Sequence, residues 1–586
     1  MPSFAAQQSL FRAYDIRGSR QHFTNDFIHA LGHAFAHLYQ LQQNADSKKH
    51  SAKNSERNSE NNCQSTNEET IVVIGYDVRC DSDTIAQALA DILSQQGIRV
   101  IQLGLVTTPM MIFWAEQYQG HGIIVTASHS AKDILGVKWL VNHISPSSTD
   151  IQALYHQLGI DNAQNPSLDS IAKPIYHKQQ QLPAQQVASA YSDAITKVFK
   201  QIYQPLNQTA EDSQLPSSKL DLVVVIDCMH GATSNIAKPL FTHFCQSVIM
   251  LNDTPDGDFP AGNPDPTEPQ RLKQLQQSVL LHQADIGIAF DGDGDRLMVV
   301  DNRGKVVTPD HLLYLLATVA VNQRPQSLNA SLSNAQVLFD IKCCHHLPKL
   351  ITELGATPVI SKTGSSLMRQ QIQNSGGQII FAGELSGHFI FNDGYFILYD
   401  DAMYAALRLL HWLAKPLPAK PNCARNLADI IDALPIIVST ADHYLPLPAT
   451  ALTDCSIVQQ LARFCQYLQQ LVHATSAAFI TQPDPQAIIS CAPLLCTCSA
   501  KNQYITLEQA QKLLPVGTKL SCIDGVRLDF ARGFGVLRQS NTSQNLTVRF
   551  AGDSIADLTD IQTRFAALCR PFNEHLATQI LAIVPE

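Results

Sequence analysis

The chain has 586 residues, 41 of them basic and 51 acidic, which gives a formal net charge of −10 at pH 7. This length predicts several domains, and a hydrophobic content of 45% is enough to form packed cores. The negative charge argues against broad nucleic-acid binding, which needs a basic surface. It allows an anionic substrate, because the local field at a site decides what binds there.

The chain lacks an apolar run as long as a membrane helix, and residues 1–10 do not have a signal-peptide pattern. We therefore expect a cytoplasmic protein without a membrane partner. The 14 cysteines are scattered, and the cluster Cys491, Cys496 and Cys498 lacks the paired Cys-x-x-Cys spacing of a zinc site. For a cytoplasmic protein we expect these thiols to be reduced.

The first part of the chain brings Arg12 and Arg17 close to a turn glycine, Gly18. Arg17 is interpreted either as a surface charge or as a group that reaches a phosphate. Residues 25–41 are predicted to form a helix. Residues 42–69 are polar and nearly free of apolar side chains, so they are predicted to form a disordered insertion.

Strands and helices then alternate from residue 70 to residue 119, which predicts a mainly parallel sheet covered by helices. The next apolar strand begins at Gly122 and ends in Thr126, Ala127, Ser128 and His129. Open α/β sheets place their active sites at such carboxyl ends. Ser128 beside His129 is therefore a candidate nucleophile with a helper, and the alternative is an ordinary polar loop. A serine hydrolase is disfavoured, because the Gly-x-Ser-x-Gly elbow is missing.

The α/β pattern restarts near residue 222, and its last apolar strand, residues 286–290, runs into Asp291, Asp293 and Asp295. Crowded carboxylates repel each other unless a cation offsets their charge, and hard oxygen ligands favour Mg²⁺. Arg296 next to them favours a phosphate-handling site. An EF-hand is excluded, because Arg296 and Asn302 stand where that motif needs Gly and Glu. A phosphatase that uses Asp291 as its nucleophile remains an alternative.

A third α/β round spans residues 336–413 and contains the turn Gly383 to His388, and three rounds of similar order indicate an internal repeat. The last part, with short strands between residues 519 and 550 and helices around them, is predicted to be an α+β domain. Its loop from Arg538 to Ser543 combines a guanidinium with several hydroxyls, which suits a phosphate dianion. The alternative for this loop is a polar hairpin.

Taken together, these motifs resemble the α-D-phosphohexomutase superfamily, and within it the bacterial phosphomannomutase/phosphoglucomutase branch. Thr126 to His129 is similar to the phosphoserine loop, Asp291 to Arg296 to the metal loop, and Gly383 to His388 to the sugar loop. Arg538 to Thr542 is similar to the phosphate loop. The family order is kept over nearly the whole chain. This sequence departs from the family where Ser130 and Ala131 follow Ser-His, and at Ser365.

The resemblance implies three related α/β domains with mixed sheets and a C-terminal α+β domain around a central active-site cleft. The expected boundaries are residues 1–183, 184–325, 326–430 and 431–586. A monomer or weak dimer is expected.

The resemblance also implies the role of each site residue. Ser128 would carry the phosphoryl group and, with the three aspartates of the metal loop, would bind Mg²⁺. The groups around the transfer would be Arg17, His129, Lys138 and Arg296. The substrate-binding residues would be Tyr14, Lys342, Glu384, Ser386, His388, Arg538, Ser540, Asn541 and Thr542.

The implied activity is the interconversion of hexose 6-phosphate and hexose 1-phosphate, of mannose, glucose or both. It would use a phosphoserine enzyme and a hexose 1,6-bisphosphate, which would also be the activator. Sugar phosphates would be the small-molecule partners. The alternatives are a phosphoglucosamine mutase, the Asp291 phosphatase and a non-catalytic sugar-phosphate binder.

Overall fold

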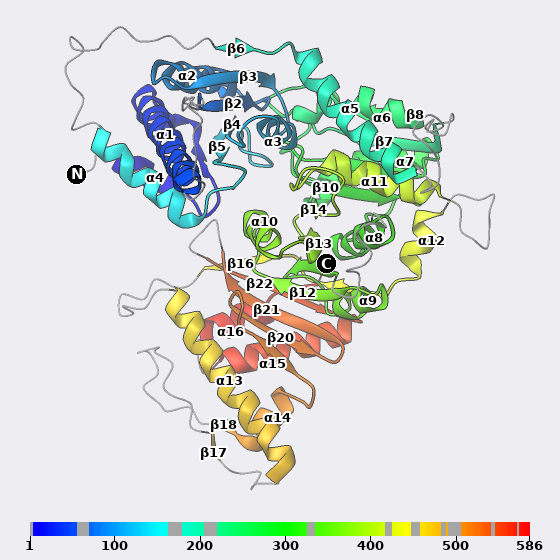
Figure 1. The fold of residues 1–586 in the computed structure, drawn as a ribbon. Helices are drawn as coiled ribbons and strands as arrows, with labels where there is room; N and C mark the ends of the chain where they lie inside the picture. Colours follow the sequence, from blue (N-terminus) through cyan, green and yellow to red (C-terminus); the bar gives the residue numbers. More distant parts are fainter. Residues whose placement is uncertain are drawn as a thin grey trace. The chain divides into compact units, whose positions relative to one another are not determined.

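The computed structural model describes residues 4–55, 69–161, 179–203, 219–324, 335–415, 425–446, 457–481, 488–489, 505–540, 545–570 and 574–585. The chain forms two compact units (Figure 1). The first contains residues 1–336 and 364–431, and the second contains residues 337–363 and 432–586. Each unit is described by itself.

The first sheet of the first unit has the strand order β1-β5-β4-β2-β3-β6. Its strands are β1 (Ile16–Ser19), β2 (Ile71–Tyr76), β3 (Arg99–Leu105), β4 (Gly122–Val125), β5 (Ile134–Leu140) and β6 (Gln180–Gln181). Strand β2 pairs parallel with β3 and β4, whereas β5 pairs antiparallel with β1 and β4. The sheet is therefore mixed, because the chain reverses direction in the loop that contains Ser128 and returns as β5.

Side chains alternate across this sheet, so its strands bury both faces. Val72 and Ile74 pack with α1 (Asn25–Ser55), α2 (Ser82–Gln95) and α4 (Ser148–Asp161) in one core cluster. Two further helices contact the sheet: α3 (Thr108–Glu116) contacts β2 and β4, and α5 (Ala184–Tyr203) contacts β3. Coverage of the sheet by helices leaves its carboxyl-end loops as the place where polar groups gather.

The second sheet has the order β10-β9-β7-β8, formed by β7 (Leu220–Asp227), β8 (Cys245–Leu251), β9 (Ile286–Phe290) and β10 (Leu297–Asp301). Strand β7 pairs parallel with β8 and β9, and β10 pairs antiparallel with β9. The helices of this round are α6 (Ala237–Phe244) and α7 (Lys273–Leu281). Since all residues of β9 and β10 are buried, the loop between these strands is held at a fixed point of the first unit.

The third α/β round is divided between the units. The first unit contains α8 (Pro309–Asn322), α10 (Ser365–Asn374), the antiparallel strands β13 (Ile379–Gly383) and β14 (Phe389–Phe391), α11 (Ala402–Ala414) and α12 (Leu427–Asp432). The second unit contains β11 (Gln336–Asp340), α9 (Leu347–Glu353) and β12 (Thr357–Ser361).

The rest of the second unit is an antiparallel sheet with helices, as an α+β domain requires. Its strands are β15 (Val438–Ser439), β16 (His443–Pro446), β19 (Lys519–Ser521), β20 (Val526–Phe530), β21 (Gly533–Gln539) and β22 (Asn545–Gly552). Its helices are α13 (Ile457–Thr481), α14 (Leu507–Leu513), α15 (Ile555–Cys569) and α16 (Glu574–Leu581), and β17 (Ile488–Ile489) pairs with β18 (Ile505–Thr506). Phe464, Phe550 and Phe565 belong to one buried core of sheet and helices.

Two sequence predictions need correction. The helix expected over residues 25–41 continues as α1 to Ser55, into the region predicted to be disordered. Residues 42–55 contain neither Gly nor Pro, so nothing in the backbone chemistry ends the helix earlier. Residues 56–68 lie outside the described part of the chain.

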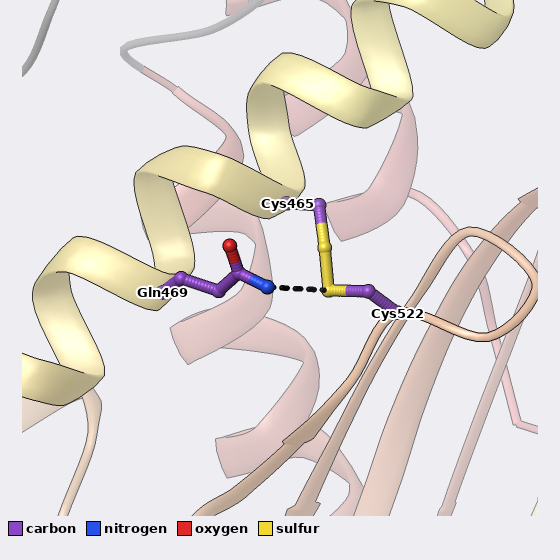
Figure 2. The surroundings of a disulfide bond; sticks show 3 residues. All are labelled: Cys465, Gln469 and Cys522. Atoms are coloured by element: carbon purple, nitrogen blue, oxygen red, sulfur yellow. Dashed lines mark hydrogen bonds between the residues drawn. A yellow bond between two sulfur atoms is a disulfide. The ribbon is translucent and has the colours of Figure 1, made fainter.

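The second correction concerns the cysteines. Cys465 on α13 and Cys522 after β19 form a disulfide, with their Cα atoms 6.3 Å apart (Figure 2). The packing of α13 on the β19–β20 hairpin brings these side chains together, which their spacing in sequence did not indicate. The other six cysteines of the described residues do not take part in a disulfide. The cluster at Cys491, Cys496 and Cys498 lies outside these residues.

Among the helices of the described residues, none combines the length and the apolar character needed to cross a membrane.

Candidate active site

The loop after β4 presents Ser128 in a left-handed backbone conformation, with φ of 52°. This region is unfavourable for a residue with a side chain and is found mainly where the surroundings impose it. The Thr126 hydroxyl accepts a hydrogen bond from the Ser128 backbone N–H at 3.0 Å. The Ser128 hydroxyl, which is buried, donates to Asp291 Oδ2 at 2.6 Å. The loop therefore directs its serine oxygen at the first carboxylate of the acidic loop.

Arg79 holds this loop in place from the end of β2. Its Nη2 donates to the carbonyl oxygens of Ser128 and Ser130, each at 2.6 Å, and its Nη1 donates to that of Ala131 at 2.6 Å. Asp77 Oδ2 accepts from Arg79 Nε at 3.1 Å and orients the guanidinium. The hydrogen bonds from Nη1 and Nη2 all go to backbone oxygens. Arg79 therefore positions the Ser128 turn independently of the side chains that follow Ser128.

The acidic loop between β9 and β10 folds around Asp291. Its Oδ1 accepts the backbone N–H groups of Gly294, Asp295 and Arg296 at 3.0, 3.1 and 3.2 Å. Gly292 is required here, because a Cβ atom at this position would collide with the carbonyl oxygen of Ser128. The two loops thus approach each other backbone to backbone.

Three buried carboxylates meet in this loop, and Asp291, Asp293 and Asp295 form one group that could hold a metal ion. Lys138 on β5 donates to Asp293 Oδ2 and Asp295 Oδ2, each at 2.7 Å. Thr108 also donates to Asp293 Oδ2, at 2.6 Å. Burial lowers the pKa of Lys138, but Asp293 and Asp295 outweigh it and raise the pKa well above its usual value. The lysine is therefore charged.

One lysine does not balance these carboxylates. Burial, Asp295 and Asp293 raise the pKa of Asp291 well above its usual value, which is the mark of uncompensated negative charge. Asp293 Oδ1 and Asp295 Oδ1 are buried and accept no hydrogen bond from the described residues. Free carboxylate oxygens in a crowded acidic site are the donor set that suits a hard divalent cation.

Basic groups line the other side of Ser128. Burial and then Arg296 and Arg17 lower the pKa of His129 well below its usual value, so this imidazole is neutral. Its Nδ1 lies 3.3 Å from the Ser128 hydroxyl. Arg17 is buried, with Nε bound to Asp15 Oδ2 at 2.9 Å and Nη1 bound to the Ser130 hydroxyl at 3.2 Å. Ser130, one of the departures from the family pattern, is therefore a partner of Arg17.

The turn between β13 and β14 lies beside the acidic loop. The Leu297 N–H, directly after that loop, donates to the Gly387 carbonyl in the turn at 2.9 Å. Within this turn, Ser386 donates to Glu384 Oε2 at 2.9 Å, and Glu384 Oε1 accepts the Gly364 N–H. The ring of Tyr14 lies against the backbone of Gly364. Tyr14, Glu384 and Ser386 thus belong to the same part of the first unit.

His388 connects the two loops electrostatically. Arg296 Nε donates to His388 Nε2 at 3.2 Å, and His388 Nδ1 lies 2.7 Å from Asp400 Oδ2 and 3.6 Å from Asp295 Oδ1. Asp400 in turn forms a buried ion pair with Arg369. This chain of hydrogen bonds and ion pairs fixes the orientation of Arg296 toward the acidic loop.

The remaining predicted residues lie in the second unit. Lys342 donates to Asp442 Oδ2 at 2.7 Å, and although burial opposes it, Asp442 and Asp340 raise its pKa, so it is charged. Arg538 Nε donates to Asp524 Oδ2 at 2.8 Å, while its buried Nη2 finds no acceptor among the described residues. The Ser540 N–H donates to the Asn545 carbonyl at 2.9 Å. Asn541 and Thr542 lie outside the described residues.

The structure therefore brings together, in one unit, most of the residues singled out in the sequence: Tyr14, Arg17, Ser128, His129, Lys138, Asp291, Asp293, Asp295, Arg296, Glu384, Ser386 and His388. Sequence reasoning missed three groups that hold them, namely Arg79, Arg369 and Asp400. The position of Arg79 after a strand end was visible in the sequence, but its partners are backbone oxygens and leave no sequence pattern. Asp400 follows the sugar loop in a run of two aspartates, which was a usable signal.

Comparison with known proteins agrees with this geometry. Models of the phosphoglucomutase/phosphomannomutase alpha/beta/alpha domains I, II and III match residues 57–160, 198–304 and 308–435. A phosphomannomutase/phosphoglucomutase of Pseudomonas syringae pv. tomato is 31% identical over 500 residues, which is 85% of this chain and 87% of the relative. A phosphoglucomutase of Neisseria gonorrhoeae is 29% identical, covering 86% of this chain and 89% of the relative.

A crystal structure of a phosphoglucomutase/phosphomannomutase family protein from Burkholderia thailandensis has a similar fold. It superposes with a TM-score of 0.69 at 26% sequence identity and covers 99% of each chain. The resemblance and the fold class predicted from the motifs are thereby confirmed, as three α/β domains with mixed sheets and a C-terminal α+β region. From this identity over most of its length, and from the motifs gathered around Ser128, we conclude that the chain belongs to the phosphoglucomutase/phosphomannomutase family.

Proposed function

We propose that the protein interconverts the 6-phosphates and 1-phosphates of mannose, glucose or both, through a phosphoserine at Ser128 and a hexose 1,6-bisphosphate. The chain is an enzyme of the phosphohexomutase type by its family. One observation carries the proposal for the site: a buried serine hydroxyl, held in a left-handed turn, points at a cluster of buried carboxylates. This arrangement suits a serine that carries a phosphoryl group next to a cation.

In the proposed reaction the phosphoserine P–Oγ bond breaks while a sugar hydroxyl oxygen forms a new bond to phosphorus. Arg17 and Lys138 would offset the charge that spreads over the phosphoryl oxygens, because phosphoryl transfer depends mostly on positioning and charge neutralisation. His129 is neutral, so it could accept the proton of the attacking hydroxyl and pass it to the departing Ser128 Oγ, which lies 3.3 Å from its Nδ1. The reverse movement of the same atoms would return a phosphoryl group from the bisphosphate to Ser128.

Asp291, Asp293, Asp295 and the phosphate on Ser128 would hold Mg²⁺, which would supply further charge neutralisation at the phosphoryl group. Lys138 reaches one oxygen of each of Asp293 and Asp295. The other oxygen of each, Oδ1, has no hydrogen-bond donor among the described residues, which supports this assignment.

We assign the sugar hydroxyls to Glu384 and Ser386, with Tyr14 and His388 beside them. The phosphate that is not being transferred would bind Arg538, Ser540, Asn541 and Thr542, with Lys342 as a further cation. The buried Nη2 of Arg538, which has no acceptor in the described part of the chain, supports an anionic ligand. Anchoring the distant phosphate converts binding energy into orientation of the reacting end.

A phosphatase with Asp291 as nucleophile fits the geometry less well. Asp291 Oδ1 already accepts three backbone N–H groups, and Oδ2 accepts the Ser128 hydroxyl. Both oxygens are thus engaged in holding the loop. Assays with mannose 1-phosphate, glucose 1-phosphate and glucosamine 1-phosphate separate the mutase alternatives, and binding without turnover of any of them would identify a sugar-phosphate binder.

The first test is the peptide mass of the purified protein after incubation with glucose 1,6-bisphosphate. We expect one acid-stable phosphate on Ser128, absent from Ser128→Ala, together with a loss of mutase activity of several orders of magnitude in that variant. Ser130→Ala is the matched control in the same loop and should keep the phosphate. A labile acyl phosphate on Asp291 with unmodified Ser128 would refute the proposal in favour of the phosphatase.

The bisphosphate is also the proposed activator, because an enzyme that loses its phosphate must be phosphorylated again before it turns over. Location in the cytoplasm, the domain boundaries and a monomeric or weakly dimeric state stay predictions from the sequence.

A further inference from the structure

A second group of metal-binding side chains lies away from the candidate active site, within the second unit. It consists of His345 and His346, which follow β11, and Asp553, which follows β22. One ligand atom of each residue lies within 4.8 Å of the others. The other two such groups among the described residues, which share Asp295, belong to the site described above.

The two imidazoles converge on a single oxygen. His345 Nε2 lies 2.9 Å and His346 Nε2 lies 2.7 Å from Asp553 Oδ1. The ring centroids are 4.0 Å apart, so the adjacent histidines face the same side of the loop, although neighbouring side chains in an extended chain diverge. More than 200 residues separate them from Asp553, with sequence separations of 208 and 207.

The charges around the group suit a divalent cation. Two imidazole rings and one carboxylate are ligand types that zinc takes in proteins. Burial raises the pKa of Asp553, but the hydrogen bonds with His345 and His346 outweigh it and lower the pKa. Asp529 adds a negative potential at His345. Arg532 is the opposing charge, but it contacts the other oxygen, with Nε 3.6 Å from Asp553 Oδ2.

We propose that His345 Nε2, His346 Nε2 and Asp553 Oδ1 bind Zn²⁺ or a related first-row divalent metal. Two imidazole nitrogens and one carboxylate oxygen form an open tetrahedral site whose fourth ligand is water. Ligand atoms around a tetrahedral zinc lie about 3.3 Å apart, so an outward movement of about 0.5 Å accommodates the ion. The side chains of His346 and Asp553 are 22% and 27% exposed, whereas that of His345 is 8% exposed, so water reaches one side of the site.

A metal binds the lone pair of an imidazole nitrogen, so each ring would carry its proton on Nδ1 when Nε2 is a ligand. The metal would then link the loop between β11 and α9 to the loop between β22 and α15, two segments of the second unit that are far apart in sequence. Such a link stabilises the unit by favouring the folded state that holds all three ligands. The inference does not depend on the proposed function.

The test is a calorimetric titration of Zn²⁺ into chelator-treated, full-length protein in an excess of Mg²⁺, which would compete with Zn²⁺ for the acidic loop. We expect the wild type to bind one equivalent more than His346→Gln and Asp553→Asn, or to bind that equivalent at least about tenfold more tightly. His575→Gln, at an exposed position on α16, is the control and should bind like the wild type. Urea unfolding checks that the variants are folded.

Titration with Co²⁺ identifies the ligands. The wild type should develop the visible absorption of tetrahedral Co²⁺ without a thiolate charge-transfer band, and both variants should lose it. Unchanged stoichiometry and affinity in the two variants would overturn the proposal, and so would a thiolate band in place of the expected spectrum, because the metal would then be bound by cysteines.

Discussion

Lys138 shows how a single side chain determines whether the active-site loops can fold before any ion binds. It projects from β5, and its ammonium is shared between Asp293 and Asp295. Ion pairs in such buried sites contribute little net stability, but removing one partner is costly because the other charges stay buried and uncompensated. Arg17 and Arg79 have similar roles on either side, since Asp15 and Asp77 orient them.

We predict that Lys138→Met lowers the free energy of unfolding by about 3 kcal/mol in the presence of a chelator. Mg²⁺ should then stabilise the variant more than the wild type, because the cation replaces the missing positive charge. Thermal unfolding with and without Mg²⁺ measures both effects.

Lys132→Met is the matched control. Lys132 pairs with Asp258, but their side chains are 53% and 81% exposed, so this substitution should change stability by less than about 1 kcal/mol. Equal stability of the two variants in chelator would mean that the carboxylates do not depend on Lys138.

Among the elements, α11 links the third α/β round to the second sheet and is buried from Ala402 to Leu413. The Asp401 carboxylate caps it by accepting the Tyr404 N–H at 3.0 Å. The His411 ring stacks on Phe199 of α5, with centroids 3.9 Å apart. Burial lowers the pKa of His411 to about 3. An imidazole in such a place is a packing group that does not tolerate protonation.

The pH dependence of stability follows from this histidine. Its pKa is lower in the folded chain than in the unfolded chain, near 6.5. The unfolded state therefore binds more protons, and stability that is present above about pH 6.5 is lost as the pH falls toward the folded pKa. We expect His411 alone to cost about 2 kcal/mol between about pH 7 and about pH 5. Urea unfolding of wild type and His411→Phe across this range tests it.

The variant keeps an aromatic ring but cannot be protonated, so its stability should fall less steeply with acid. His282→Phe, at an exposed position after α7, should keep the slope of the wild type. If the unfolding free energies of wild type and His411→Phe change with pH at the same slope, His411 is protonated equally in the folded and unfolded states.

For the whole molecule, the second unit joins two stretches of chain that lie on either side of residues 364–431. Arg527 on β20 connects them, because its Nη1 donates to the carbonyl oxygens of Ile341 and Cys343 at 2.5 and 2.6 Å. The guanidinium also contacts Asp529 and lies over the Phe534 ring, 4.1 Å from its centroid. A buried cation thus holds the backbone next to Lys342.

We predict that Arg527→Met destabilises the second unit by about 3 kcal/mol, because two buried carbonyl oxygens and the Asp529 carboxylate lose their partner. Hydrogen exchange of residues 337–343 should accelerate in parallel. Arg570→Met, at a half-exposed ion pair with Glu574, is the control and should leave both measurements unchanged. Faster exchange confined to residues near 527 would show that Arg527 does not hold the distant segment.

Strands with strong local patterns could be predicted from the amino-acid sequence alone. β9 has the predicted bounds, residues 286–290, because a buried apolar run is a local property of the sequence. The motif loops were also local, since each follows a strand end with its functional groups adjacent in sequence. These features were enough to identify the family, which the comparisons confirm.

The contacts that hold the loops could not be predicted from local patterns, because they form only in the folded chain. The left-handed turn at Ser128, the hold of Arg79 on backbone oxygens and the chain from Arg369 through Asp400 to His388 depend on residues far apart in sequence. The same is true of the disulfide between Cys465 and Cys522 and of the convergence of His345 and His346 on Asp553. A local pattern depends only on residues that are neighbours in sequence. Contacts between distant segments arise only when sheets and helices pack.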